Sequence, residues 1–459
     1  MSNVKSMRPI LSLLAAALVS VVAGCGDSGG AGAAASAVPE DVAVYVSVDT
    51  SFEGDQWRTV ADLLAKFPDG EGALEELLDD AASEAGLEGD ADLRGALGPE
   101  VAIAVLAGPP GPEGEPPVVL LTQPEDKDAW DQLFEDEHAA RAEVRGWQAV
   151  AQDEDVLDRY RDALEHGTLE DSEGFAEAMD DLPEDSLARL YANGESLVQA
   201  VPELGAGMQQ FPFGAAAGGA DALIGAALRA EEDGVRIEGR ALSTAEDALP
   251  GSGPYESELV EEVPAGAVAF LSFNGLGAAL MEYADMLGGA QSAFLPFDLG
   301  QVSTVLSGET AVYVRPGPTV TLVTEVEDEA AALETVEALL GLGGEQVPIV
   351  YDAFDGLLVV SGSREELEAF RGDGPRLDQD DRFEEAVAEA GMPDATTGFG
   401  YVDVQGVVPL FLGLMPPEGV ELEAEAAEAL EYLEPLGGAV FWGERSGDAQ
   451  RFSFFLGID

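Results

Sequence analysis

The chain has 459 residues, of which 46% are hydrophobic, so it is long enough for two domains of ordinary size with apolar cores, and disorder throughout is excluded. Its 90 acidic residues against 21 basic ones give a formal net charge of −69. A surface of that charge disfavours binding to nucleic acid and to anionic lipid headgroups, because both carry negative phosphates.

The chain opens with a positive stretch that contains Lys5 and Arg8, followed by an apolar run over residues 11–24 that is short for a permanent membrane span. The run ends in Val22-Ala23-Gly24-Cys25. This pattern resembles bacterial lipoprotein signal peptides, whose +1 cysteine takes a diacylglyceryl group on its thiol. The sequence therefore predicts a signal peptide over residues 1–24, lipidation of Cys25, and a lipid-anchored location on the extracytoplasmic side of the cell membrane. The alternative is cleavage elsewhere, which would leave Cys25 as a free thiol.

Residues 26–37 are almost wholly Gly, Ala and Ser, a composition typical of a flexible linker. We therefore expect a flexible tether over residues 25–37. Cys25 is the single cysteine, so no intramolecular disulfide is available and stability must come from packing.

Segments of the first half return in the same order in the second half. Residues 38–49 resemble residues 263–274, 97–105 resemble 306–314, 150–161 resemble 360–371, and 182–191 resemble 392–401. The order of these matches predicts two copies of one unit.

Each copy reads as a strand, a helix, a hairpin-like pair of strands, further helices and a closing strand pair. The hairpin over residues 310–314 and 319–324 turns at Pro316-Gly317, and helices are expected over residues 327–340 and 421–433. The predicted fold class is α+β, with helices packed on one face of a mainly antiparallel sheet in each copy. We expect the first repeat over residues 38–243, a linker over 244–258, and the second repeat over 259–459.

Four short motifs are Pro39-Glu40-Asp41 before the first strand, Gly54-Asp55-Gln56-Trp57, Lys66-Phe67-Pro68 and Leu97-Gly98-Pro99-Glu100-Val101. They resemble motifs of a bacterial envelope family known only as domain of unknown function 3352. The resemblance spans most of the chain after the signal peptide. It implies an exported or membrane-tethered protein of unassigned activity and supplies no catalytic residue.

Three explanations compete for the acidity: solubility in a salty or high-G+C bacterial setting, calcium binding, and attraction of a basic partner. The calcium hypothesis rests on Asp90 with Asp92, and on Asp378, Asp380 and Asp381. Neither group has the glycine and distal glutamate of an EF-hand loop. We therefore expect no metal site.

Catalytic motifs are absent from the sequence. The two histidines, His138 and His166, fall in acidic stretches of the first copy and have no counterpart in the second. No nucleophile elbow, zinc-binding helix motif or phosphate-binding loop occurs. Acidic pairs are too common here to indicate a glycosidase. We expect no enzyme activity and no cofactor.

Apolar turns with aromatic residues are the candidate contacts for a partner or ligand. Phe211 and Phe213 belong to one such turn, and Phe411 and Met415 to another at the corresponding place in the second copy. Core packing is the alternative reading, but an apolar rim on an acidic body would mark a contact site.

The sequence favours a non-enzymatic, membrane-tethered binding module that meets an unknown envelope protein or small ligand, and no nucleic acid. A second hypothesis is a tethered receptor for an apolar or cationic small molecule bound between the two repeats. A carboxylate-based enzyme is the third.

Overall fold

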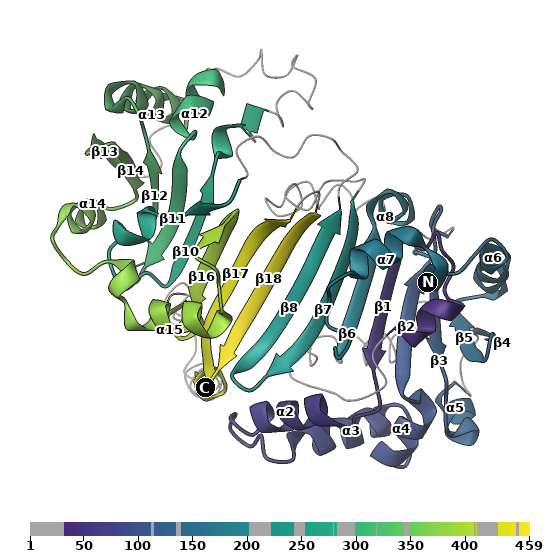
Figure 1. The fold of residues 1–459 in the computed structure, drawn as a ribbon. Coiled ribbons are helices and arrows are strands. Elements are labelled where there is room, and N and C mark those ends of the chain that lie inside the picture. Colours follow the sequence, from purple (N-terminus) through teal and green to yellow (C-terminus); the bar gives the residue numbers. More distant parts are fainter. Residues whose placement is uncertain are drawn as a thin grey trace. The chain divides into compact units, whose positions relative to one another are not determined.

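The computed structural model describes residues 32–459, except 112–113, 135–138, 202–221, 243–252, 279, 282–298, 318, 344–348, 408–409, 411–429 and 447–448. The chain forms two compact units. Unit 1 comprises residues 1–245 with 448–451 and 458, and unit 2 comprises residues 246–447 with 452–457 and 459. Figure 1 shows the elements of both.

Unit 1 is built on an antiparallel sheet. Its strands are β1 (Val44–Asp49), β2 (Glu100–Val105), β3 (Val118–Thr122), β4 (Ala140–Val144), β5 (Trp147–Ala151), β6 (Ala188–Asn193), β7 (Leu223–Glu231) and β8 (Gly234–Leu242). Its helices are η2 (Ala33–Ala37), α2 (Asp55–Leu64), α3 (Ala73–Glu84), α4 (Asp90–Leu97), α5 (Lys127–Leu133), α6 (Glu154–Leu164), η3 (Leu169–Asp171), α7 (Glu173–Met179) and α8 (Gly194–Ala200).

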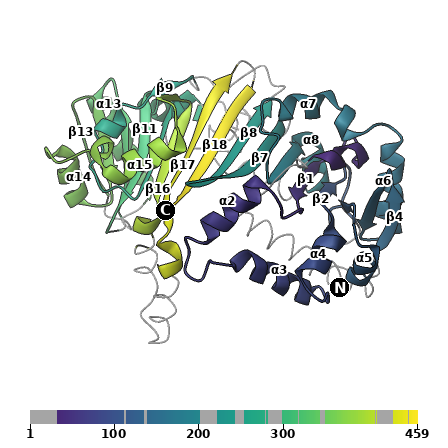
Figure 2. The ribbon, with the colours of Figure 1, turned by 60° about the horizontal axis from the view of Figure 1, so that its bottom comes forward.

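Helices lie on both faces of the unit 1 sheet. Leu157 and Tyr160 of α6 pack in the main core on the face that holds Tyr45 of β1. On the other face lie Trp130 of α5 and Phe134, the residue after that helix. They pack against Val101, Leu120 and Val150, strand residues whose side chains point away from the main core. Figure 2 shows α2, α3 and α4 on one side of this sheet, with α7 and α8 on the other.

Local sequence signals explain where several of these helices begin. The side chain of Asp153 accepts a hydrogen bond from Val156 N at 2.8 Å and so caps α6. Asp126 and Ser172 cap α5 and α7 in the same way. Short polar side chains are favoured at this position because they satisfy a backbone N–H that has no partner within the helix.

The strands of unit 2 are also paired antiparallel, and β18 (Ala449–Ile458) lies mostly in this unit. Its main strands are β10 (Ala269–Asn274), β11 (Glu309–Arg315), β12 (Thr319–Glu325), β13 (Val350–Phe354), β14 (Leu357–Ser361), β16 (Gly398–Asp403), β17 (Leu436–Ser446) and β18, and β9 (Tyr255–Glu256) pairs with β15 (Ala395–Thr396). Its helices are η5 (Leu259–Glu261), α12 (Leu299–Val305), α13 (Glu329–Gly343), α14 (Arg364–Arg371), η7 (Leu377–Gln379) and α15 (Asp381–Ala390).

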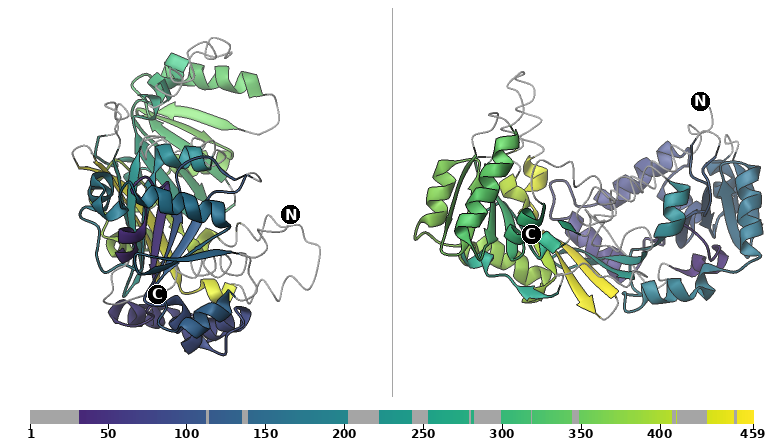
Figure 3. Two further views of the ribbon diagram at one scale, coloured as in Figure 1. Left: turned by 90° about the vertical axis from the view of Figure 1, so that its right-hand side faces the viewer. Right: turned by 90° about the horizontal axis from the view of Figure 1, so that it is seen from above.

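The unit 2 sheet is also covered on both faces (Figures 1 and 3). Leu367 and Phe370 of α14 join the core that contains Phe270 of β10. Ala332 and Val336 of α13 pack on the opposite face. The predicted α+β class with mainly antiparallel sheets is confirmed. The expectation of helices on one face alone is wrong, since both units have helices on two faces.

Each strand of one sheet has a counterpart in the other. The strand order is β4-β5-β3-β2-β1-β6-β7-β8 in unit 1 and β13-β14-β12-β11-β10-β16-β17-β18 in unit 2. Tyr45 of β1 lies opposite Ala104 and Tyr191, as Phe270 of β10 lies opposite Tyr313 and Tyr401. We call residues at matching register positions counterparts. The internal duplication stays a prediction.

The predicted tether and linker differ from the structure at their ends. Within residues 25–37, η2 is a 3-10 helix in which Ala34, Ala35 and Ala37 are buried, so the last part of the predicted tether belongs to the fold. Alanine side chains are small enough to pack closely against a sheet, which composition alone did not reveal. Within the predicted linker 244–258, Tyr255 and Glu256 form β9.

Gly98, between α4 and β2, adopts φ +67°, and a Cβ added to it would lie 2.0 Å from the carbonyl oxygen of Gln123. We expect Gly98→Ala to lower the free energy of unfolding by about 2 kcal/mol or more, from left-handed backbone strain and the clash with a backbone atom. Denaturant unfolding measures this. Gly253→Ala is the control, because a Cβ there meets nothing within 4 Å. Equal effects of the two changes would refute the prediction.

Candidate functional site

The candidate contact residues from the sequence cannot be placed. Cys25, Phe211, Phe213, Phe411 and Met415 all lie outside the described residues. Two other features of unit 1 bear on function. One is a set of side chains that holds the N-terminal segment, residues 32–38, and the other is a pocket next to it.

Glu100, the first residue of β2, is buried and binds the start of the N-terminal segment. Its Oε1 atom accepts hydrogen bonds from Gly32 N at 2.9 Å and Ala34 N at 3.3 Å. The hydroxyl of Tyr45 donates to the same oxygen at 3.4 Å. A carboxylate at this place satisfies backbone N–H groups at the beginning of η2 that the helix itself leaves without partners.

Two further side chains hold the same segment from its other end. Tyr160 of α6 donates its hydroxyl to Ala37 O at 2.6 Å, and Arg145 donates to Ser36 O at 3.1 Å. We call Glu100, Arg145 and Tyr160 the N-terminal clamp. The clamp joins the segment to β2, to the β4–β5 turn and to α6, so three elements fix the chain before β1 begins.

Burial changes the proton affinity of the clamp. It raises the pKa of the Glu100 carboxyl above its ordinary value, and the N–H donors of Gly32 and Ala34 act in the opposite direction. Burial, and then the neighbouring Glu100, raise the pKa of the Tyr45 phenol. The carboxylate form of Glu100 is therefore held in the fold at a cost in desolvation.

Unit 2 repeats the glutamate at the counterpart position. Glu309 opens β11 and accepts hydrogen bonds from Glu258 N at 2.8 Å and Leu259 N at 3.2 Å, at the start of η5. It also accepts from the hydroxyls of Ser272, at 2.6 Å, and Ser257. The same carboxylate interaction therefore precedes the central strand of both sheets.

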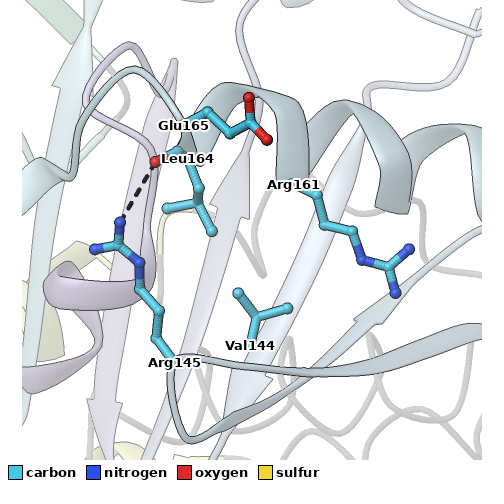
Figure 4. Close-up of a pocket in the computed structure, with 5 residues that line it drawn as sticks. All are labelled: Val144, Arg145, Arg161, Leu164 and Glu165. Carbon is cyan, nitrogen blue, oxygen red and sulfur yellow. Dashed lines mark hydrogen bonds between the residues drawn. The ribbon is translucent and has the colours of Figure 1, made fainter.

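An open pocket of about 430 Å³ lies between the β4–β5 turn and the C-terminal part of α6. It is lined by Val144, Arg145, Arg161, Leu164 and Glu165. Figure 4 shows Val144 and Leu164 between the two arginines, and the Glu165 carboxylate on the helix side, away from Val144. The lining thus combines two guanidinium groups and one carboxylate with an apolar floor.

The two arginines have different partners. Arg145 donates to the carbonyl of Leu164 at 3.4 Å as well as to Ser36, and within the described part of the chain it has no ion pair with a carboxylate. Arg161 pairs with Asp158 on the same helix at 3.0 Å, where both side chains are largely exposed. Such a pair contributes little to stability, so the guanidinium of Arg161 is available to an anion.

The residues proposed for metal or acid–base chemistry have structural roles. Asp380 accepts hydrogen bonds from Arg382 N and Gly266 N, and Asp92 accepts one from Glu88 N. His166 is exposed, with Nδ1 3.0 Å from Asp162 O, and His138 lies outside the described residues. Across the described ranges, no group of three or more His, Cys, Asp or Glu side chains is arranged to hold a metal ion.

No protein-family model matches the chain, and no curated protein matches it. Among solved structures, a crystal structure of TP0453 matches with 14% identity over 44% of this chain and 79% of that one, at a TM-score of 0.24. A score this low does not indicate a shared fold. None of the helices in the described ranges is long and apolar enough to cross a membrane.

The sequence carries one signal for Glu100, which is repetition and not a catalytic motif. Glutamate stands at the same place in the two similar segments 97–105 and 306–314, as Glu100 and Glu309. Arg145 and Arg161 carried no such signal, because their proximity depends on how α6 packs against the β4–β5 turn.

The raised pKa of Glu100 predicts a pH dependence of stability. A carboxyl with a higher pKa in the folded chain binds its proton more tightly when folded, so its contribution is present below the ordinary carboxyl range and is lost as the pH rises through the raised pKa. Glu100→Gln keeps an acceptor for Gly32 and Ala34 but removes this titration. From about pH 4 to about pH 8, the melting temperature of the wild type should therefore fall relative to that of Glu100→Gln.

Thermal unfolding of both proteins across that pH range measures the effect. Repulsion among the other acidic residues affects both proteins equally, so the difference between them isolates Glu100. A difference that stays constant with pH would contradict the prediction.

Proposed function

We propose that this chain is a lipid-anchored binding module on the extracytoplasmic side of a bacterial membrane, with no catalytic activity of its own. One observation carries the proposal. Gly32 follows Cys25 by only seven residues and is already bonded to the buried Glu100. A lipid on Cys25 would therefore be joined to a segment that the fold holds through several hydrogen bonds.

The short connection limits how far unit 1 reaches from its anchor. A chain extends by at most about 3.6 Å per residue, so seven residues span roughly 25 Å at most. A module on such a connection works next to the bilayer. Partners in the membrane, or close to its surface, are within its range.

The charge supports a particular kind of partner. A body with a net charge of −69 is repelled by anionic headgroups, so the anchor, and not the surface of the protein, would supply membrane affinity. We expect the partner to present a basic or uncharged face. The non-enzymatic part of the proposal rests on the sequence, in which one cysteine and two histidines leave little nucleophile or base chemistry. Membership of the domain of unknown function 3352 family belongs to the same proposal.

Lipidation is tested by Cys25→Ser in the full-length chain expressed in a bacterial host. We expect the wild type to incorporate labelled palmitate and to sediment with membranes, because two or more acyl chains hold a protein stably on a bilayer. The variant should incorporate no label and leave the membrane fraction. Unchanged labelling and sedimentation would overturn the anchored part of the proposal.

The binding role is tested by crosslinking in cells, followed by pull-down and mass spectrometry. We expect a reproducible envelope protein that is lost when Phe211 and Phe213 are both changed to alanine, because these aromatic residues stand beside a proline in a predicted apolar turn. Tyr432→Ala is the control, since Tyr432 is an exposed aromatic residue of unit 2. Recovery of the same protein with the double variant would exclude this turn as the contact.

A further inference from the structure

The pocket beside α6 lies where unit 1 and unit 2 differ in sequence. Val144 ends β4 and Phe354 ends β13, and each precedes a two-residue turn to the next strand, so the two residues are counterparts. Arg161 and Arg371 are counterparts too, since each stands eight residues after the N-cap of its helix, Asp153 in α6 and Ser363 in α14.

In unit 2, the chain itself fills this place. The guanidinium carbon of Arg371 lies 4.5 Å from the centre of the Phe354 ring, a cation–π contact. The same guanidinium forms an ion pair with Asp352, which stands two residues before Phe354 on β13. The guanidinium of Arg371 thus contacts both the ring of Phe354 and the carboxylate of Asp352.

Unit 1 keeps the arginine but lacks both groups. Val144 replaces the ring, and Ala142, the counterpart of Asp352, has no carboxylate. Trp147, opposite Val144, is larger than its counterpart Leu357, but it is buried in the core of unit 1. The result is the pocket of about 430 Å³, with Val144 and Leu164 at its floor and Arg161 at its edge.

The turn after Val144 has an unusual residue type, arginine, at its first position. Arg145 and Gly146 have φ values of 53° and 85°, and their counterparts Asp355 and Gly356 have 52° and 79°. A turn with two positive φ values favours Asn-Gly or Asp-Gly, so arginine at the first position is costly to the turn. Its side chain contacts Ser36 and Leu164 and adds a second cation to the pocket.

We propose that this pocket binds a small ligand that carries an aromatic ring and a carboxylate. The ring takes the place that Phe354 has in unit 2, against Val144 and Leu164 and beside the guanidinium of Arg161. The carboxylate takes the role of Asp352 and pairs with Arg161. The same chemistry is present in a free aromatic acid and in a peptide that ends in phenylalanine. The inference deepens the binding role proposed above and rests on it.

Glu165 sets the limit on affinity, because its carboxylate also lines the pocket and repels an anion. For a ligand of about a dozen heavy atoms in an open site we expect a dissociation constant on the order of 1 mM. Removing the negative charge with Glu165→Gln should tighten binding by roughly two- to fivefold.

The test is a titration of the purified full-length chain with 3-phenylpropionate, followed by ligand-observed NMR. We expect saturable binding that weakens roughly two- to fivefold for 3-cyclohexylpropionate, which has no π-face, and that is lost for 3-phenylpropionamide, which has no charge. N-acetylglycylphenylalanine is the second probe. Tighter binding of that peptide than of 3-phenylpropionate assigns the peptide end as the source, and the reverse assigns the free acid.

Two variants locate the site. Val144→Phe places in unit 1 the ring that unit 2 has, and Arg161→Gln removes the cation, so each should abolish binding. Arg58→Gln is the matched control, because Arg58 is also an exposed helical arginine paired with an aspartate three residues away, Asp55. Arg145 is left unchanged, since it also holds Ser36.

Binding that persists in Val144→Phe, or no binding to the wild type at about ten times the expected dissociation constant, would overturn the proposal. Far-UV circular dichroism and the melting temperature show whether each variant is folded. A folded Val144→Phe chain that still binds places the ligand elsewhere. This test does not involve Cys25, Phe211 or Phe213, so its failure is distinct from failure of the membrane and partner experiments.

Discussion

A buried carboxylate at the first position of the second strand fixes the entry of the chain into each sheet. Glu100 and Glu309 are both almost fully buried, and each accepts backbone N–H groups from the 3-10 helix that precedes the central strand. The desolvation cost of burying such a group is offset only when its hydrogen bonds are made. The short helices η2 and η5 therefore depend on these two glutamates, and the central strands β1 and β10 follow them.

The two units share one strand order but differ in their side chains. Glu309 is bonded by Ser257 and Ser272, whereas Glu100 is bonded by Tyr45. At the outer hairpin, unit 2 covers its arginine with Phe354 and unit 1 does not. Because the strand order is the same, these differences are not required by the fold. In unit 1, these differences leave the pocket between the β4–β5 turn and α6, next to the N-terminal segment.

The strands and hairpins were predictable from the sequence, because period-two patterns and turn residues act locally. The second helical layer was missed, although residues 101–105 form a continuous apolar run in which Val101 and Ile103 face one way and Ala102 and Ala104 the other. Such a run is typical of a strand buried on both faces. The clamp and the pocket were beyond local patterns. With 90 acidic residues, Glu100 stood out only through its repetition at Glu309, and the approach of Arg145 to Ser36 is a tertiary contact.

The clamp also determines which bonds resist a pulling force on the N-terminus. A pull on the N-terminus reaches Gly32 first, and it is opposed there by Glu100 and farther along by Arg145, Tyr160 and the bond from Leu169 N to Val38 O. These bonds come from four different elements, so the load is shared before it reaches β1, which is paired on both sides by β2 and β6. The central strand is therefore shielded from being peeled out of its sheet by tension in the leading segment.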